Sequence, residues 1–210
     1  EVISPEKIII QNHTDSIDFL LHKKGFQLSD MQISTVIVFK DFKDFKNFRS
    51  RTKRYIKSGK INDESYNYIQ LKTKSQKLMA YKLVEKNLLS NYGKEPAHSF
   101  SELIMLENLY PNKILFFGGF KNNEMKVSQI IFKINKKTNH IFYMAKSLER
   151  DPVIDIGLIN FVVNEFENDG SKLLNFGISS RGNEIKWNIH NYKEQFSKNL
   201  HSRNVWTLIK

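Results

Sequence analysis

The sequence contains no cysteine, which excludes disulfide bridges and thiolate chemistry and fits a reducing compartment. No stretch approaches the roughly eighteen consecutive apolar residues of a membrane-spanning helix, and no signal peptide is visible. We therefore expect a cytoplasmic protein without a transmembrane segment. The chain begins with Glu1 rather than methionine, which indicates a processed or truncated product.

Several catalytic motifs are also missing. The sequence has no paired-histidine metal spacing such as H-E-x-x-H, no phosphate-loop motif and no G-x-S-x-G elbow, so we expect no metal centre. Acyl transfer to an amine needs none of these motifs. It needs an amine held against an activated carbonyl, a base or water to take the proton, and donors for the oxyanion.

Acidic residues are outnumbered, with 22 Asp and Glu against 33 Lys and Arg, for a net charge of +11. A basic surface favours phosphate-bearing partners, which include nucleic acid, nucleotide cofactors and membrane head groups. A lysine-rich solvated surface would give the same composition. The net charge alone therefore does not distinguish between these functions.

A chain of 210 residues with 40% hydrophobic content can bury the core of one domain, or of one domain plus a fragment. Apolar periodicity, β-branched runs and capping signals predict the elements. In chain order they are strand 7–10, helix 14–23 with Thr14 as N-cap, strand 33–39, helix 41–60, strand 65–71, helices 74–92 and 99–110, strands 114–120, 126–134 and 140–145, helix 153–167, strand 173–178, a helix after residue 182, and strand 204–209. The order predicts an α/β (α+β) fold, with a three-strand antiparallel meander, a βαβ crossover, a mixed sheet and flanking helices.

The stretch 172–196 organises this prediction. An apolar strand, 173–178, breaks at 179–182 and continues into a helix for which Gly182 and Asn183 supply the turn and the N-cap. The predicted buried face of that helix holds Ile185, Ile189, Tyr192 and Phe196. Ligands of open α/β sheets bind beyond the carboxyl ends of strands, so we expect substrate near Ser179.

The order of elements resembles that of GNAT-type acyltransferases. The motif LLNFGISS, followed by Gly182, Asn188 and YKEQF at 192–196, resembles the carboxyl-terminal signature of the Fem-like branch. The motif KEPAH at 94–98 and the basic helix 49–57 resemble that group too. The resemblance covers about residue 39 to the end. Fem-like proteins carry two GNAT-like lobes, which implies that 1–60 is a partial first lobe and 61–210 one GNAT-like domain.

The resemblance implies an acyl- or aminoacyltransferase that forms an amide on an amino group of a cell-envelope precursor. The acceptor would be an amino sugar, a peptide or another small molecule. The alternative is a catalytically inactive, basic GNAT-fold module that binds nucleic acid or an anionic surface. The sequence does not specify the oligomeric state.

The acyl donor implied by the resemblance is acyl-CoA or aminoacyl-tRNA, and no further cofactor is expected. GNAT enzymes that use acyl-CoA cradle its pyrophosphate with a glycine-rich turn before a helix. The matching stretch, 146–153, has no glycine, two acids and a proline, which disfavours that mode. Lys146 and Arg150 offset the repulsion, so we assign any cofactor binding to them. Fem-like transferases can use aminoacyl-tRNA, for which helix 49–57 would bind phosphates unless it is merely solvent-facing.

Three residues are assigned catalytic roles. The resemblance implies that Lys193 places a cation near a phosphate or the oxyanion, although its spacing alone fits a solvated helix lysine. Ser179 is a polar group at the strand end, and its other possible role is to shape the turn. His98 could act as a base, or it is a loop histidine before the helix capped by Ser99 and Glu102.

Four further residues are assigned to substrate binding. Asn188 and Arg181 belong to the motif stretch, where Asn188 could instead bond backbone. Met144 and Ala145 end the third meander strand, where GNAT-like folds hold the acyl carbonyl with a backbone N–H.

Overall fold

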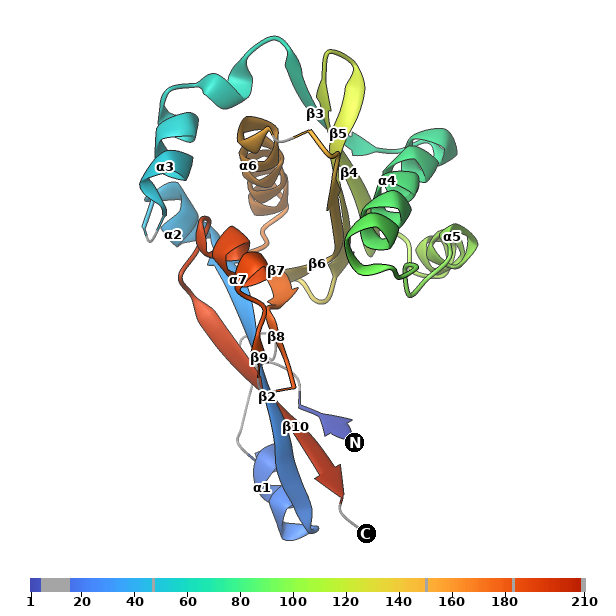
Figure 1. The fold of residues 1–210 in the computed structure, drawn as a ribbon, viewed down its shortest axis with the longest axis vertical. Helices are drawn as coiled ribbons and strands as arrows, with labels where there is room; N and C mark the ends of the chain where they lie inside the picture. The colour runs from blue at the N-terminus through green and yellow to red at the C-terminus, as the bar shows by residue number, and fades with distance from the viewer. Residues whose placement is uncertain (5–15, 47, 150, 183, 209–210) are drawn as a thin grey trace. The chain divides into compact units, whose positions relative to one another are not determined.

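The computed structural model describes residues 1–4, 16–46, 48–149, 151–182 and 184–208 (Figure 1). The predicted strand 7–10, the predicted N-caps Thr14 and Asn183, and Arg150 lie outside these ranges. The chain divides into two compact units. We call Glu1–Arg49 with Leu173–Lys210 the terminal unit, and Ser50–Lys172 the central unit. This division is not the one predicted at residue 60.

The central unit is built on four antiparallel strands in the order β6-β5-β4-β3. They are β3 (Tyr66–Leu71), β4 (Ile114–Lys121), β5 (Glu124–Lys133) and β6 (Thr138–Lys146). Asn122 and Asn123 join β4 to β5 with φ of 49° and 65°. Two successive left-handed residues are typical of a type I′ hairpin turn, whose twist suits the adjoining strands. The predicted meander is therefore confirmed.

Helices cover both faces of this sheet. Figure 1 shows α4 (Lys74–Tyr92) and α5 (Phe100–Leu109) on one face and α6 (Pro152–Asn168) on the other. The bounds of α4 are those predicted, and α5 begins with the predicted Ser99–Glu102 capping box. The core beneath α4 and α5 contains, among others, Leu71, Ala80, Val84, Leu103, Phe116 and Ile130. Leu78 and Tyr92 of α4 lie outside this core and are 37% and 49% exposed.

The predicted helix 41–60 is wrong as a single element. The structure has α2 (Phe39–Lys43), α3 (Ser50–Lys57) and a 3₁₀ turn, Lys60–Asn62. Phe45 has a left-handed φ of 53°, which ends the helical path. Its ring meets the edge of Phe48 at 5.8 Å, and Phe48 meets Phe42 at 4.7 Å. These three aromatic side chains therefore form a local cluster around a turn rather than one face of a helix.

The terminal unit has four strands in the order β1-β10-β2-β7, each antiparallel to its neighbour. They are β1 (Val2–Ile3), β2 (Phe26–Val38), β7 (Leu173–Ile178) and β10 (Leu200–Leu208). The predicted bounds of β7 are confirmed, and Leu174, Asn175 and Phe176 in it are buried. Helix α1 (Ser16–Lys23) lies beside β2. The predicted α/β class, with a mixed sheet and flanking helices, is confirmed.

The helix after β7 begins later than predicted. Ser180–Arg181 (β8) and Glu184–Ile185 (β9) form a small hairpin, and α7 spans Trp187–Glu194. Gly182 at the hairpin tip has a φ of 59°, which a glycine adopts without strain. Ile185 therefore belongs to a strand, and the buried residues of α7 are His190 and Lys193. Phe196 is buried as expected, just beyond the helix.

No helix in the described ranges is both long and apolar enough to cross a bilayer. Helix α6 instead packs tightly on the sheet of the central unit. A methyl group added at Gly157 would lie 2.0 Å from the Tyr68 hydroxyl oxygen and 2.2 Å from its ring carbon Cζ. Glycine is required there because the tyrosine ring end occupies the space of a side chain.

Gly157→Ala should therefore lower the free energy of unfolding by about 3 kcal/mol, since an overpacked core must shift its backbone. Asn164→Ala, at an exposed position of the same helix, is the control. Urea denaturation of both variants measures the difference. Equal stability of the two variants would contradict the close contact.

Candidate functional site

The turn at the end of β7 is held by a buried ammonium group. Lys193 in α7 is 5% exposed, and its Nζ donates to the carbonyls of Gly177 at 2.8 Å and Ile178 at 2.7 Å. Gly177 has a left-handed φ of 73°, and its amide donates to Asn175 Oδ1 at 2.6 Å. A buried cation is costly unless it is paired or hydrogen-bonded, so these carbonyls account for its position. Lys193 is therefore not a solvated helix lysine.

Ser179 follows this turn with a fixed backbone and an unpartnered side chain. Its amide donates to the Ile33 carbonyl at 2.7 Å, and its carbonyl accepts from the Lys186 amide at 2.8 Å. Its hydroxyl is buried and has no hydrogen-bond partner among the described residues, and the same holds for Nδ1 of His190. Buried polar groups are usually hydrogen-bonded, so these two atoms are candidates for binding a ligand.

Arg181 and Asn188 lie on the surface of the terminal unit. Arg181 is in β8 and Asn188 is in the first turn of α7, and both are exposed. Between them in sequence, Trp187 is 62% exposed and meets the His190 ring edge-on at 5.6 Å. An accessible aromatic ring beside polar groups suits contact with a substrate.

In the central unit, Met144 and Ala145 lie at the end of β6 as predicted, and the strand continues to Lys146, which was expected in the following loop. They pair with Gln129, Ser128 and Val127 of β5. Just before them the register shifts, because Tyr143 pairs with Ile130 and Ile141 with Ile131. Phe142 is therefore the extra residue of a β-bulge, a feature that often re-aims groups near functional sites.

Carboxylates surround the start of α6. Asp151 is the N-cap, whose Oδ1 accepts from the Val153 amide at 3.0 Å. Its Oδ2 accepts from Tyr66 at 2.8 Å and from Lys121 at 2.6 Å. Burial opposes ionisation of Asp151, but the hydrogen bonds from Lys121 and Tyr66 outweigh it and hold the pKa of the carboxyl below its usual range. The carboxylate of Asp151 thus occupies the N-terminus of α6, the position that attracts an anion.

A second lysine near this end of the helix, Lys126, is also paired with carboxylates. Lys126 Nζ donates to Glu124 at 2.8 Å and to Glu149 at 2.7 Å. These hydrogen bonds raise the pKa of Lys126 and lower that of Glu149. Among the described residues here, Lys121 and Lys126 are thus bound to carboxylates rather than available to a pyrophosphate.

Asp155, one turn into α6, is a site residue that the sequence analysis missed. It is 7% exposed, and its Oδ2 accepts from Lys146 Nζ at 3.2 Å. Its Oδ1 is buried with no partner among the described residues, as is the Tyr68 hydroxyl. Burial raises the pKa of both groups. The available signal was a single acid inside the apolar run VIDIGLINFVV, 153–163.

His98 is held by a tyrosine. The Tyr143 hydroxyl accepts from the His98 amide at 3.0 Å and lies 3.2 Å from Nδ1 of its ring. Either group can be the donor in the contact between the hydroxyl and Nδ1, because the hydroxyl can donate to the ring nitrogen or accept from it. Glu102 is the capping-box acid, and the Ser99 amide lowers its pKa.

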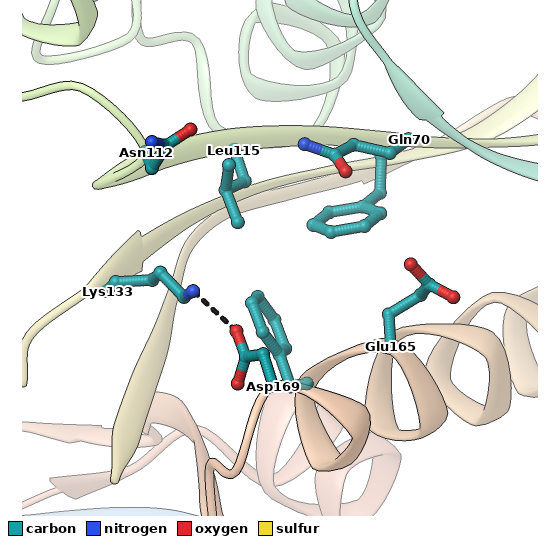
Figure 2. A pocket seen from close by; sticks show the side chains of 8 residues that line it. Gln70, Asn112, Leu115, Lys133, Glu165 and Asp169 are labelled. Carbon is teal, nitrogen blue, oxygen red and sulfur yellow. Dashed lines mark ion pairs between the residues drawn. The ribbon is translucent and has the colours of Figure 1, made fainter. Parts of the chain in front are cut away.

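A small polar pocket of about 200 Å³ opens elsewhere in the central unit (Figure 2). Gln70 and Leu115 reach it from the strands, Glu165 from α6 and Asp169 from the residue just after α6, and Lys133 pairs with Asp169. None of the predicted site residues lines it. Within the described ranges, no group of three or more His, Asp or Glu residues could hold a metal ion.

The predicted site residues thus fall into two groups. Lys193, Ser179, Arg181 and Asn188 belong to the terminal unit, where Lys193 and Ser179 meet at one turn. His98, Met144, Ala145 and Lys146 belong to the central unit. In the central unit the structure also places Asp155, which was not predicted, in contact with Lys146.

No protein-family model and no curated protein matches this chain. Solved structures do match. The C-terminal domain (DUF2156) of a protein assigned as a lysylphosphatidylglycerol synthetase from Agrobacterium fabrum has a TM-score of 0.66 at 10% identity, over 90% of this chain and 64% of that one. L-PGS from Bacillus licheniformis has a TM-score of 0.66 at 12% identity, over 90% of this chain and 63% of that one. FemX has a TM-score of 0.66 at 10% identity, over 92% of this chain and 69% of that one.

These likenesses show the fold. The predicted resemblance to the Fem-like branch of GNAT-fold proteins is confirmed at that level. The chain spans less than two thirds of the length of the first two structures, 64% and 63%.

Replacing Lys193 tests its role at the turn. Lys193→Met should lower the free energy of unfolding by about 2–3 kcal/mol, because two buried carbonyls lose a charged donor. Lys198→Met, at an exposed position of the same unit, should change it by less than about 0.5 kcal/mol. Urea denaturation compares them. A Lys193→Met variant as stable as the control would show that the ammonium does not hold the turn.

Asp155 gives a pH-dependent prediction. The pKa of Asp155 is higher in the folded state than in the unfolded state, because burial disfavours the carboxylate. As pH rises above about 4, the unfolded state therefore loses its proton first, and the free energy of unfolding falls. Asp155→Asn should therefore be more stable than the wild type at pH 7, and the difference should vanish at low pH.

The control for this measurement is Asp169→Asn. Burial disfavours ionised Asp169, but Lys133 and Ser171 outweigh it and lower its pKa, so this variant should lose stability at neutral pH. Thermal unfolding across a pH series measures both. An Asp155→Asn variant that is less stable at pH 7 would contradict the prediction.

Proposed function

We propose that this protein transfers an aminoacyl group from aminoacyl-tRNA to the amino group of a small acceptor, such as an amino sugar or a peptide. The observation that carries the choice of donor is the anionic start of α6, where Asp151 caps the helix and Glu149 binds Lys126. A pyrophosphate placed there would meet carboxylates. The transfer reaction itself is supported by the fold, which is shared with FemX and with proteins named for lysylphosphatidylglycerol synthesis.

The reaction needs no co-reactant beyond donor and acceptor. The neutral amine attacks the ester carbonyl of the aminoacyl group, and the new C–N bond forms as the C–O bond to the ribose breaks. The proton lost by the amine passes to a base and then to the departing ribose oxygen. The products are an amide and uncharged tRNA.

We assign the base to Asp155. A carboxylate with a raised pKa accepts a proton more readily than an ordinary one, and its Oδ1 is without a partner among the described residues. The ring of His98, the base expected from the sequence, has its Nδ1 3.2 Å from the Tyr143 hydroxyl, which occupies that nitrogen. Lys146 keeps the second oxygen of Asp155 in place.

Lys193 and Ser179 have different parts in this proposal. Lys193 is a positioning residue, because its ammonium is committed to the carbonyls of Gly177 and Ile178. By fixing that turn it sets the place of the Ser179 hydroxyl. That hydroxyl is buried without a partner among the described residues and can hydrogen-bond a ligand of the terminal unit.

Helix α3 supplies the phosphate-binding surface for tRNA. Its sequence, SRTKRYIK, contains no acid, and its basic residues Arg51, Lys53, Arg54 and Lys57 are exposed. Arg54 and Lys60 each lie 5.8 Å from the ring of Tyr55. Several cations on one short helix suit the closely spaced phosphates of a nucleic acid.

The second candidate is the catalytically inactive binding module. The hydrogen bonds from Lys193 to two backbone carbonyls favour this candidate. They give the lysine of the Fem-like motif a structural role rather than a catalytic one. The two candidates share α3 and differ in whether a bond is formed. A transfer assay separates them.

The assay supplies purified protein with radiolabelled aminoacyl-tRNA and amine acceptors, and in parallel with labelled acetyl-CoA. Label should move from tRNA to an acceptor, and Asp155→Asn should slow this at least about 100-fold. Asp169→Asn is the control. Since Asp155→Asn is also expected to be the more stable protein at pH 7, its loss of rate would not reflect unfolding.

A different result of the assay would contradict each part of the proposal. Full activity in Asp155→Asn would remove Asp155 as the base. Transfer from acetyl-CoA alone would overturn the donor. No transfer from either donor, with tRNA still bound, would support the binding module.

A further inference from the structure

Helix α1 of the terminal unit presents its apolar side chains to solvent. None of its residues is buried, and Ile17, Phe19 and Leu20 are 45%, 58% and 57% exposed. A surface helix of a folded domain normally turns such a face inwards. Its orientation here is the reverse of the usual one.

The helix is held by its acid instead. Asp18 Oδ1 accepts from Ser4 Oγ at 2.7 Å and from Trp206 Nε1 at 2.9 Å. Its Oδ2 accepts from Asn204 Nδ2 at 2.9 Å. Three hydrogen bonds thus fix the polar side of α1 on the sheet, so the outward direction of its apolar side is built into the fold.

The sheet extends the same apolar surface. Leu28 and Leu208 share one sheet face with Trp206, because Leu28 pairs with Trp206 and Leu208 lies two residues along β10. Met31 pairs with Asn204, whose side chain points to α1. Leu28, Met31 and Leu208 are 49%, 47% and 45% exposed. Figure 1 shows α1 alongside these ends of β2 and β10.

We call the side chains of Ile17, Phe19, Leu20, Leu28, Met31 and Leu208 the apolar patch. Cations rim it, since α1 ends in His22 and Lys23 with Lys24 next, all exposed. Lys23 Nζ lies 5.5 Å from the ring centre of Phe19. An apolar surface with lysines at its border matches a bilayer interface, where side chains enter the acyl boundary and cations meet anionic head groups.

A second copy of the chain fits less well. It would bring the same lysines to the contact, on a chain whose net charge is already +11. Like charges placed opposite each other at an interface cost free energy. The occupant must be apolar and anionic.

We propose that the apolar patch docks the terminal unit on the surface of an anionic lipid membrane. Ile17, Phe19 and Leu20 enter the interface, and Lys23 and Lys24 bind head-group phosphates. Asp18 keeps α1 in this orientation through Ser4, Asn204 and Trp206. The patch contains no residue assigned to transfer, so this proposal stands independently of the proposed function.

Vesicle co-sedimentation tests it with the full chain. The protein should bind phosphatidylcholine vesicles that contain phosphatidylglycerol, and should bind pure phosphatidylcholine much less. The double variant Phe19→Ser, Leu20→Ser should bind the anionic vesicles at least about tenfold more weakly, because two apolar side chains no longer enter the interface.

Leu109→Ser is the matched control, because Leu109 is 63% exposed in α5 of the central unit. It should bind like the wild type. Equal binding by the Phe19→Ser, Leu20→Ser variant would overturn the proposal and leave only a general attraction of a basic protein. Light scattering gives the other decisive outcome. A wild-type dimer that this variant dissociates, without vesicle binding, would assign the patch to a second copy and overturn the proposal.

Discussion

The candidate site of the terminal unit depends on one buried ammonium group. Lys193 binds the carbonyls of Gly177 and Ile178, and so ties α7 to the end of β7. Gly177 turns the chain there in a left-handed conformation that a side chain would disfavour. Ser179, the β8–β9 hairpin and the start of α7 all follow from this turn. A lysine is suited to the task, since its single nitrogen can serve two carbonyls from the far end of a long stem.

A second constraint acts at the start of α6 in the central unit. A helix N-terminus attracts anions, and here Asp151 of the chain itself fills that position. Lys121 and Lys126 are bound to acids, and Asp155 lies buried one turn further. The electrostatics of this region therefore disfavour a pyrophosphate. In the proposed function the phosphate-binding surface, α3, is separate from the reacting groups.

Local signals explain what the sequence predicted well. The bounds of β7 and α4, the capping box of α5 and the order of the meander strands rest on apolar runs, caps and turn residues that act within a few positions. Lys193 was predicted from a resemblance in motif, and Ser179 from its place at the end of a strand. Their meeting at one turn agrees with that motif, whereas their chemical roles remain predictions.

Tertiary packing explains what the sequence missed. Phe45 breaks the predicted helix 41–60 because its ring joins Phe48 across a turn. The β8–β9 hairpin takes Ile185 out of a helical period that looked regular. The apolar side of α1 points outwards because Asp18 is hydrogen-bonded to Ser4 and Trp206, which are far apart in sequence. The periodicity of the helix sequence alone does not predict such partners.

The identity of the acyl donor is tested most directly by titrating the protein with acetyl-CoA and with charged tRNA at low and high salt. We predict a dissociation constant for acetyl-CoA no tighter than roughly 0.1 mM, or about −5.5 kcal/mol. Binding of tRNA should be tighter at low salt and fall steeply as salt rises. Replacing Arg51, Lys53 and Arg54 of α3 by glutamate should abolish it. Micromolar, salt-tolerant binding of acetyl-CoA, with tRNA unbound, would contradict the account.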